Sequence, residues 1–552
     1  MPIWTQSYNP LGDWRLSTLV AAVPVLVLLG SLITGRVSAR NAALLGLGAA
    51  FLIAVGVFRM PPSLAAAAAA NGMVFAIFRI AWLIVAAVFL YDIAVLTGQF
   101  EVLKQSIARL SGDRRLQAIL VAFAFGAFIE GAAGFGAPVA ISAAFLVGLG
   151  FAPFQAALLC LIANTAPVAW GAIGTPILTL AGVTGLNVDA LSITTGRILP
   201  PISFLVPIWL VCTLAGWRAT LQVWPALLVI GGTFAAVQWA WSNWVGVELV
   251  DIASSVASLI AGVILLTRWK PKVEWQFPHE AEHEITPAPV HSASRVARAI
   301  LPFALLSVFV FVWGIPAVRD FLDSKTSWKP GMPGLHLAIA RGAEITGHPT
   351  PEPKDLEKAE LTIVPISSTG TAVFLSAVLS GLVLGVSPVQ LARIFIKTIV
   401  RLRDAIATIL LMLALGYLTK ASGLDTVLGL AFTRVGPILY PVFGTLLGWL
   451  GVALTGSDTS SNVLFGNLQR VTAERLGLNP ILMASANSAG GVMGKMVDAQ
   501  SIVVGAAATG ESGHEGKLLR AVLWHSIALA GLVSAVVWLY AHAFPSLVPT
   551  NR

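Results

Sequence analysis

Charged residues are scarce in this sequence of 552 residues. Asp, Glu, Lys and Arg together make up 11% of the chain, whereas a soluble domain carries about 25%. So few charges cannot cover a water-exposed surface, which excludes a soluble enzyme, a nucleic-acid binder and a secreted scaffold. Hydrophobic residues make up 57%, and the mean hydropathy is +0.84. The composition predicts a polytopic membrane protein, in which the net charge of +8 reflects cytoplasmic loops.

Cysteine and enzyme motifs are equally rare. Cys160 and Cys212 lie in apolar stretches and indicate neither a disulfide framework nor a metal cluster. The sequence contains no Gly-rich phosphate loop ending in Gly-Lys-Ser/Thr, no His-Glu-x-x-His and no Gly-x-Ser-x-Gly. We therefore expect no enzyme, no cofactor and no metal site, and transport that is driven by ion gradients rather than by ATP.

Long apolar runs recur along the whole chain. Many are long enough to cross about 30 Å of hydrocarbon as helices. No segment alternates between apolar and polar residues as barrel strands do, and open sheets cannot lie in lipid. We predict an all-α polytopic membrane protein with roughly 12–14 transmembrane helices.

Lys and Arg concentrate in four short segments, which the positive-inside rule places in the cytoplasm. These segments are 36–40, 104–115, 268–298 and 393–403. Counting spans backwards from them places the N-terminus outside. The chain then divides into an N-terminal transmembrane half (1–267), a cytoplasmic linker (268–298), and a C-terminal transmembrane half (299–552) that includes an external, irregular hydrophilic loop (317–362).

The two halves show a weak internal repeat. A shift of 325 residues places Gly98 on Gly423, and after a two-residue gap Asn164 falls on Asn487. The repeats cover about 98–176 and 423–499. Their charges place 98–114 in the cytoplasm and 421–434 outside, so the repeats run in opposite directions. Inverted repeats with interrupted helices or re-entrant hairpins are typical of secondary transporters, whose binding site lies where the interruptions meet at mid-membrane.

The first interruption, called here the first break, is 130–138 and reads EGAAGFGAP. Its glycines and proline do not favour a continuous helix. Glu130, at its start, is a carboxylate in apolar sequence, and such acids are functional by default. A carboxylate that takes up and releases a proton within a transport pathway is what proton coupling needs. The alternative is a glutamate that only caps or pairs helices.

The second break, 455–462, reads TGSDTSSN and is the densest polar run in any predicted span. Its hydroxyl groups and Asp458 suit three roles: capping a half-helix, hydrogen-bonding an anion, or coordinating a small cation. Capping alone accounts for Ser457 or Thr459. It does not account for the whole run in an apolar setting, so we favour a binding site.

Two companion segments follow the breaks. One contains Asn164 and Thr165, and the other contains Asn487 and Lys495. The Lys495 ammonium is expected either to pair with an acid (Glu130, Asp458 or Asp498) or to bind a substrate carboxylate beside a half-helix N-terminus. The alternative is that it extends to the nearer membrane interface.

Four stretches resemble the bacterial L-lactate permease family. They are 130–140, 164–169, 454–462 and 490–496. The resemblance covers almost the full length, and it implies an inner-membrane symporter that takes up lactate, and often glycolate, with a proton. It does not identify the binding residues, which remain an inference from the breaks.

We assign the coupled proton to Glu130 or Asp458. The predicted substrate-binding residues are Lys495, Asn164, Thr165, Ser457, Thr459, Asn487, Gly134 and Gly136. The expected partners are a small 2-hydroxy monocarboxylate (L-lactate, D-lactate or glycolate), protons and the lipid bilayer, and not nucleic acid. A sodium-coupled carboxylate transporter and a channel or purely structural membrane protein remain the alternatives.

Overall fold

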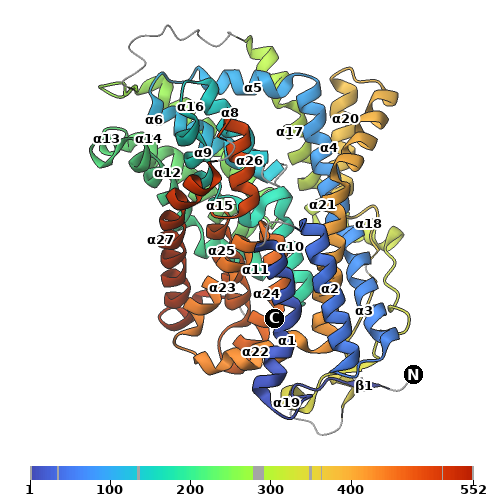
Figure 1. Cartoon of the computed structure of the whole chain (residues 1–552). Coiled ribbons are helices and arrows are strands. Elements are labelled where there is room, and N and C mark those ends of the chain that lie inside the picture. Colours follow the sequence, from blue (N-terminus) through green and yellow to red (C-terminus); the bar gives the residue numbers. More distant parts are fainter. Residues whose placement is uncertain are drawn as a thin grey trace.

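The structure is a computed structural model, and it describes residues 3–33, 37–132, 137–277, 291–346, 351–361, 363–511 and 514–549. The described chain is almost wholly helical (Figure 1). Its single sheet has two short parallel strands, β1 (Trp4–Thr5) and β2 (Ile339–Ala340). The prediction of an all-α membrane fold is confirmed.

Twenty helical elements precede the linker in the described chain. They are α1 (Trp14–Ile33), α2 (Ala39–Gly56), α3 (Pro62–Phe75), η1 (Ala76–Ala81), α4 (Trp82–Leu96), α5 (Gln99–Ala108), α6 (Arg114–Ala118), η2 (Ile119–Phe125), α7 (Gly126–Ala132), α8 (Ala137–Gly148), α9 (Pro153–Ala163), η3 (Val168–Trp170), α10 (Gly171–Thr184), α11 (Val188–Ile198), α12 (Pro200–Ala215), α13 (Trp217–Gln222), α14 (Trp224–Ala226), η4 (Leu227–Gly231), α15 (Gly232–Trp244) and α16 (Val250–Arg268) among the described residues.

The C-terminal half follows the linker. Its helical elements are α17 (Ala293–Gly314), α18 (Pro316–Thr326), α19 (Ala343–Thr346), η6 (Pro353–Asp355), α20 (Thr369–Val383), α21 (Pro388–Ser422), α22 (Leu424–Phe432), η7 (Thr433–Val435), α23 (Tyr440–Thr455), α24 (Asp458–Leu476), α25 (Pro480–Gly494), α26 (Ala499–Thr509), α27 (Glu515–His542) and η8 (Pro545–Leu547). The 317–362 loop, predicted to be irregular, is partly ordered, because α18 and β2 lie within it.

Local sequence sets many of these boundaries. The long helix α21 begins after Ser387, whose hydroxyl accepts a hydrogen bond from the backbone N–H of Gln390 while the Gln390 side chain bonds back. Such a capping box stabilises a helix start, and a serine cap contributes about 1 kcal/mol. The helix ends at Gly423, which has a φ of +82° and so adopts a left-handed conformation that favours glycine.

Five helices of the described chain are long and apolar enough to cross a membrane, or seven if each of two bent pairs counts as one span. This number is below the 12–14 crossings expected from the sequence. Several predicted spans are instead shorter apolar helices, and others are interrupted. One bent pair, α9 with η3 and α10, turns by 65° at 164–167. The interrupted helices expected from the sequence are therefore present.

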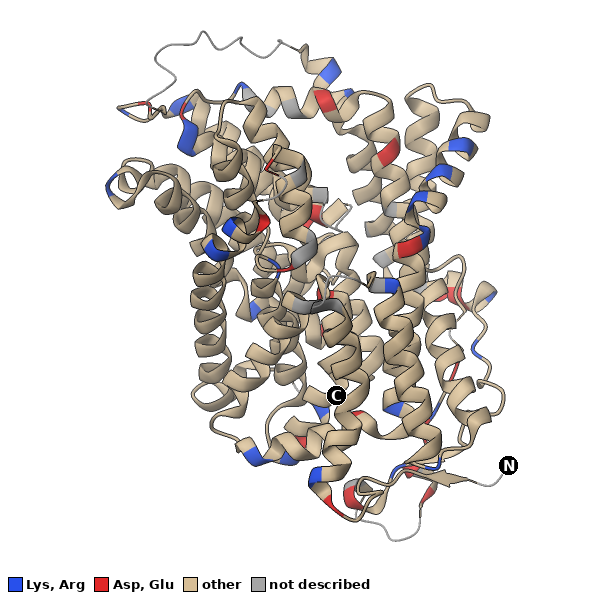
Figure 2. Ribbon diagram, viewed as in Figure 1, with Lys and Arg blue, Asp and Glu red and all other residues tan. Residues whose placement is uncertain are grey.

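Several of the predicted external segments lie at one end of the molecule. β1, α19 and α22 lie at the lower end in Figure 1, whereas α5 and the start of α17 lie at the upper end (Figure 1). The Gln6 amide donates hydrogen bonds to the carbonyls of Lys420 and Ala421, which ties the N-terminal tail to the end of α21. Charged residues lie mainly at the upper and lower ends and along the helices at the upper right, with a few in the interior (Figure 2).

The two predicted repeats follow the same order of elements. Gly98, with a φ of +74°, separates α4 from α5, as Gly423 separates α21 from α22. Two packing contacts are reciprocal, because α10 packs against α24 while α26 packs against α8. Since α5 and α22 lie at opposite ends (Figure 1), this arrangement is the one that inverted repeats require.

Candidate functional site

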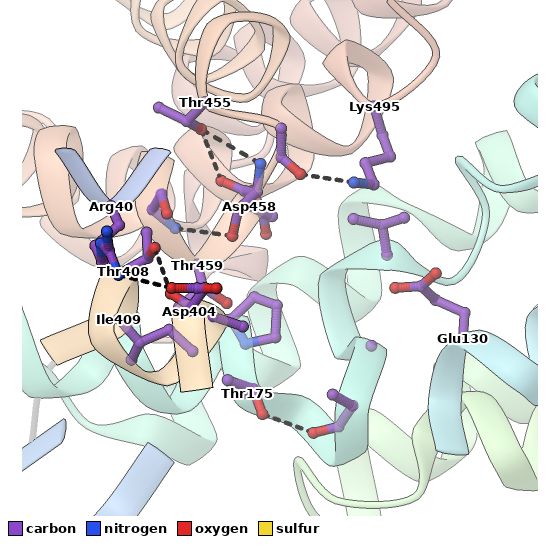
Figure 3. A pocket seen from close by; sticks show the side chains of 18 of the residues that line it. Arg40, Glu130, Thr175, Asp404, Thr408, Ile409, Thr455, Asp458, Thr459 and Lys495 are labelled. Atoms are coloured by element: carbon purple, nitrogen blue, oxygen red, sulfur yellow. Dashed lines mark hydrogen bonds and ion pairs between the residues drawn. The ribbon is translucent and has the colours of Figure 1, made fainter. Parts of the chain in front are cut away.

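A central cavity of about 470 Å³ lies among α7, α10, α21 and the turn between α23 and α24 (Figure 3). Five of the ten predicted site residues line it: Glu130, Ser457, Asp458, Thr459 and Lys495. They come from both repeats. The cavity is of the size typical of small-molecule sites, which are clefts of about 300–1,000 Å³.

Glu130 lies on α7 and extends into this cavity (Figure 3). Its side chain is buried, and its Oε2 atom has no hydrogen-bond partner among the described residues. Gly171 faces it so closely that a Cβ atom there would lie 2.5 Å from Oε1. Only glycine at position 171 therefore leaves the carboxylate this position. Lys495 and Asp498 are its charged neighbours.

Asp458 is the first residue of α24, but it is not the helix cap. Ser457 has that role, since its hydroxyl accepts a hydrogen bond from the backbone N–H of Ser460 at 3.2 Å. One carboxylate oxygen of Asp458 accepts hydrogen bonds from the hydroxyl of Ser488 and the amide of Asn462. The other, Oδ1, has no partner among the described residues. Asp458 is thus held in place through one oxygen, while the other is buried next to Gly491.

Lys495 connects the second break to the turn that precedes α26. Its Nζ atom donates a hydrogen bond to the Gly456 carbonyl at 2.6 Å and lies 3.3 Å from Oδ2 of Asp498. The side chain is only 5% exposed. The alternative that Lys495 extends to the membrane interface is therefore wrong, and Asp498 is the acid that pairs with it.

The other predicted residues lie away from the lining. Asn164 is buried beside Glu130. The Thr165 hydroxyl donates a hydrogen bond to the Ile162 carbonyl of the preceding helix, α9. Asn487 donates to the side chain of Asn462 at 3.0 Å and joins α25 to α24. Gly134 and Gly136 lie outside the described residues.

The structure adds residues that sequence reasoning did not select. Arg40 and Asp404 line the cavity and form an ion pair of 2.8 Å between α2 and α21 (Figure 3). Both side chains are about half exposed. The sequence places Arg40 only in a cytoplasmic segment. A basic residue near the end of a span does not indicate which acid, far away in the sequence, it will pair with.

Asp251 is a second residue that was missed. It lies in the first turn of α16 and is 1% exposed. The signal was present, since it is the only acid in the apolar run 251–267. No group of three or more His, Cys, Asp and Glu side chains that could hold a metal ion occurs in the described ranges.

Interrupted helices around a cavity lined by acidic and basic side chains define a polytopic membrane protein of the secondary-transporter type. Comparison with known proteins identifies a single family. The family model for L-lactate permease matches residues 17–544. The chain belongs to the L-lactate permease family.

Curated relatives match along almost their whole length. The chain is 42% identical to an L-lactate permease of Bacillus subtilis, over 99% of this chain and 100% of the relative. It is 40% identical to the glycolate permease GlcA of Escherichia coli, again over 99% and 100%. Among solved structures, the efflux pump MtrF of Neisseria gonorrhoeae overlaps 95% of this chain and 94% of its own, at 13% identity and a TM-score of 0.45.

Proposed function

We propose that the protein is a symporter that takes up L-lactate and related 2-hydroxy monocarboxylates, D-lactate and glycolate, with a proton across the bacterial inner membrane. The substrate class follows from relatives named for lactate and for glycolate. The observation that supports proton coupling is that Glu130 and Asp458 line one cavity and each has a buried carboxylate oxygen without a hydrogen-bond partner among the described residues.

The charges of the lining explain why anion and proton would bind together. The described lining residues include two basic side chains, Arg40 and Lys495, and three acidic ones, Glu130, Asp404 and Asp458. Arg40 is paired with Asp404 and Lys495 with Asp498, so the charge that remains at the cavity is that of Glu130 and Asp458. When both are ionised they repel a carboxylate, and protonation of either one removes a negative charge and so favours a monoanion. Lactate binding and protonation are therefore mutually favourable.

The polar groups of the second break suit the remaining contacts. The N-terminus of α24 directs backbone N–H groups towards the cavity, and helix N-termini favour anions. The hydroxyls of Ser457 and Thr459 line the same wall and are suited to bond the carboxylate and hydroxyl of lactate. Lys495 supplies the positive charge, while Asn164 and Asn487 hold the walls rather than the substrate.

The proposed topology keeps the N-terminus and the 317–362 loop outside and the 268–298 linker in the cytoplasm. Supporting this, β1 of the N-terminal tail pairs with β2 of the loop, so both lie on one side. The repeats at about 98–176 and 423–499 form the transport core, and the remaining helices of 1–267 and 299–552 surround it.

The experiment is uptake of radiolabelled L-lactate into proteoliposomes with an alkaline interior and no sodium. We expect accumulation above equilibrium that collapses with a protonophore. Accumulation only with an inward sodium gradient would overturn proton coupling and support the sodium-coupled alternative, in which the second break binds the cation. Equilibration without accumulation under either gradient would indicate a channel.

A further inference from the structure

A second cavity of about 790 Å³ lies near the predicted external side. Its lining includes Glu248, Trp313 and residues 367–370. Trp313 and 367–370 flank the hydrophilic loop that the sequence places outside. The central cavity is lined instead by Ser38, Arg40 and Asp404, from segments that the sequence places in the cytoplasm. In the proposed topology, the two cavities therefore lie towards opposite sides of the membrane.

The start of α10 and the segment around Val247 lie between the two cavities, and the α10 backbone is strained there. Ala172 and Ile173 of α10 have φ values of +43° and +58°, which side-chain-bearing residues rarely adopt. Gly174 follows, and a Cβ atom there would lie 2.7 Å from the carbonyl oxygen of Val247. Ala172 lines the central cavity and Val247 lines the second. Strained backbone of this kind concentrates at functional sites.

Asp251 packs against α7 at Gly131, and Glu130 is its charged neighbour. A Cβ atom on Gly131, the neighbour of Glu130, would lie 2.8 Å from the Cβ of Asp251. Neither carboxylate oxygen of Asp251 has a hydrogen-bond partner among the described residues. The chain reaches Asp251 from Glu248, in the lining of the second cavity, in three residues. Asp251 therefore lies between an acid of each cavity.

No basic side chain neutralises Asp251 from the elements around it. In the described structure, α7, α10, α15, η2 and η4 pack most extensively on α16. The only charged or titratable residue in those five elements is Glu130. A buried carboxylate without a countercharge or hydrogen bonds is unfavourable when ionised. Glu130, whose nearest base is Lys495, is the charged neighbour of Asp251, and the two acids cannot both be ionised at low cost, so a proton on one favours its loss from the other.

We propose that Asp251 is a second proton-carrying residue, which exchanges the coupled proton with Glu130 and connects the central cavity to the second cavity. In the transfer, the O–H bond of the Asp251 carboxyl breaks and an O–H bond forms on the Glu130 carboxylate, and the reverse step returns the proton. Glu248 lines the second cavity, as does Asp189, and it is the acid closer to Asp251 along the chain. The proton thus reaches Glu130 from the second cavity without first entering the central one. This inference rests on the proposed proton–lactate symport.

The test is Asp251→Asn in proteoliposomes that contain a pH-sensitive dye. We expect lactate–lactate exchange within about threefold of wild type, and a loss of at least tenfold in both proton-driven lactate accumulation and lactate-dependent proton entry. Exchange is the readout that separates the two roles, because a merely structural aspartate would affect exchange as well. Accumulation within twofold of wild type would overturn the proposal.

A matched control is Asp425→Asn. Asp425 is also buried, but its carboxylate accepts a hydrogen bond from Asn467 at 3.2 Å and it lies on α22, outside both cavities. This variant is expected to keep exchange and coupling. A wild-type protein that shows no proton-driven accumulation would instead refute the proposed function, so the two failures are distinguishable.

A second measurement uses the unaltered protein, in case Asp251→Asn does not fold. Dicyclohexylcarbodiimide modifies protonated carboxyl groups in apolar surroundings, and mass spectrometry locates the adduct. We expect adducts on Asp251 and Glu130 that decrease as the pH is raised. Modification of Glu130 without any modification of Asp251 would overturn the proposal.

Discussion

The ammonium of Lys495 donates a hydrogen bond to the carbonyl oxygen of Gly456 at 2.6 Å. The two residues are 39 positions apart, and each occupies an interruption in a helix of the second repeat. The bond joins the turn after α23 to the turn before α26. Because Gly456 has a φ of +74°, its carbonyl is not used in a regular helix and is available to the lysine. Lys495 therefore has a structural contact as well as a charge at the cavity.

Replacing Lys495 by methionine is expected to weaken lactate binding. The substitution keeps an apolar stem of similar length but removes the charge, and a hydrogen bond to a charged group contributes about 1.5–3 kcal/mol. We expect an increase in the lactate KM for exchange of about tenfold or more. The control is Lys397→Met, at an exposed position of α21. An unchanged KM in folded protein would restrict Lys495 to its structural bond with Gly456.

The variant Glu130→Gln is expected to abolish proton-driven lactate accumulation and to retain some exchange. The amide keeps the shape of the side chain but cannot take up and release a proton at neutral pH. The pH dependence of exchange should also flatten, because the net charge of the cavity no longer changes at this residue. Uptake and exchange are measured between pH 5.5 and 8, with Glu101→Gln on the exposed side of α5 as the control. Accumulation equal to wild type would remove Glu130 from the coupling mechanism.

A single methyl group at Gly171 is expected to impair coupling. A Cβ atom there would lie 2.5 Å from the Glu130 carboxylate, so Gly171→Ala forces that side chain to move. The backbone itself tolerates alanine, since φ is −55°. We expect accumulation to fall about tenfold while the protein remains folded, as judged by thermal unfolding in detergent. Gly148→Ala is the control, because nothing lies within 4 Å of its Cβ position.

The inverted arrangement predicts opposite accessibility for two engineered cysteines. In a background without Cys160 and Cys212, Arg109→Cys should be labelled from the cytoplasm and Ile438→Cys from outside. Both positions are exposed, and they follow α5 and α22, which lie at opposite ends of the molecule (Figure 1). Whole cells and inverted vesicles treated with an impermeant maleimide provide the measurement. Labelling of both residues from the same side would contradict the inverted repeats.

The site residues that the sequence identified share a simple signal, which is polarity in an apolar setting. Glu130, Asp458 and Lys495 stand out for that reason, and all three line the cavity. Asn487 carries the same signal but bonds to Asn462 inside the helix packing. Burial of a polar residue therefore predicts that it has a partner, whether the partner is a substrate or a neighbouring side chain. Only the fold distinguishes the two.

The sequence by itself determined the class of protein, because transfer of apolar side chains from water depends on composition and not on the path of the chain. It also determined where helices stop, since glycine, proline and capping residues act on their own few neighbours. Only the tertiary structure decided which residues meet: Arg40 with Asp404, Lys495 with Asp498 and Gly456, and Asp251 behind Glu130. Those contacts depend on how helices from both repeats pack, and charges that lie far apart along the chain have no local pattern that records their eventual distance.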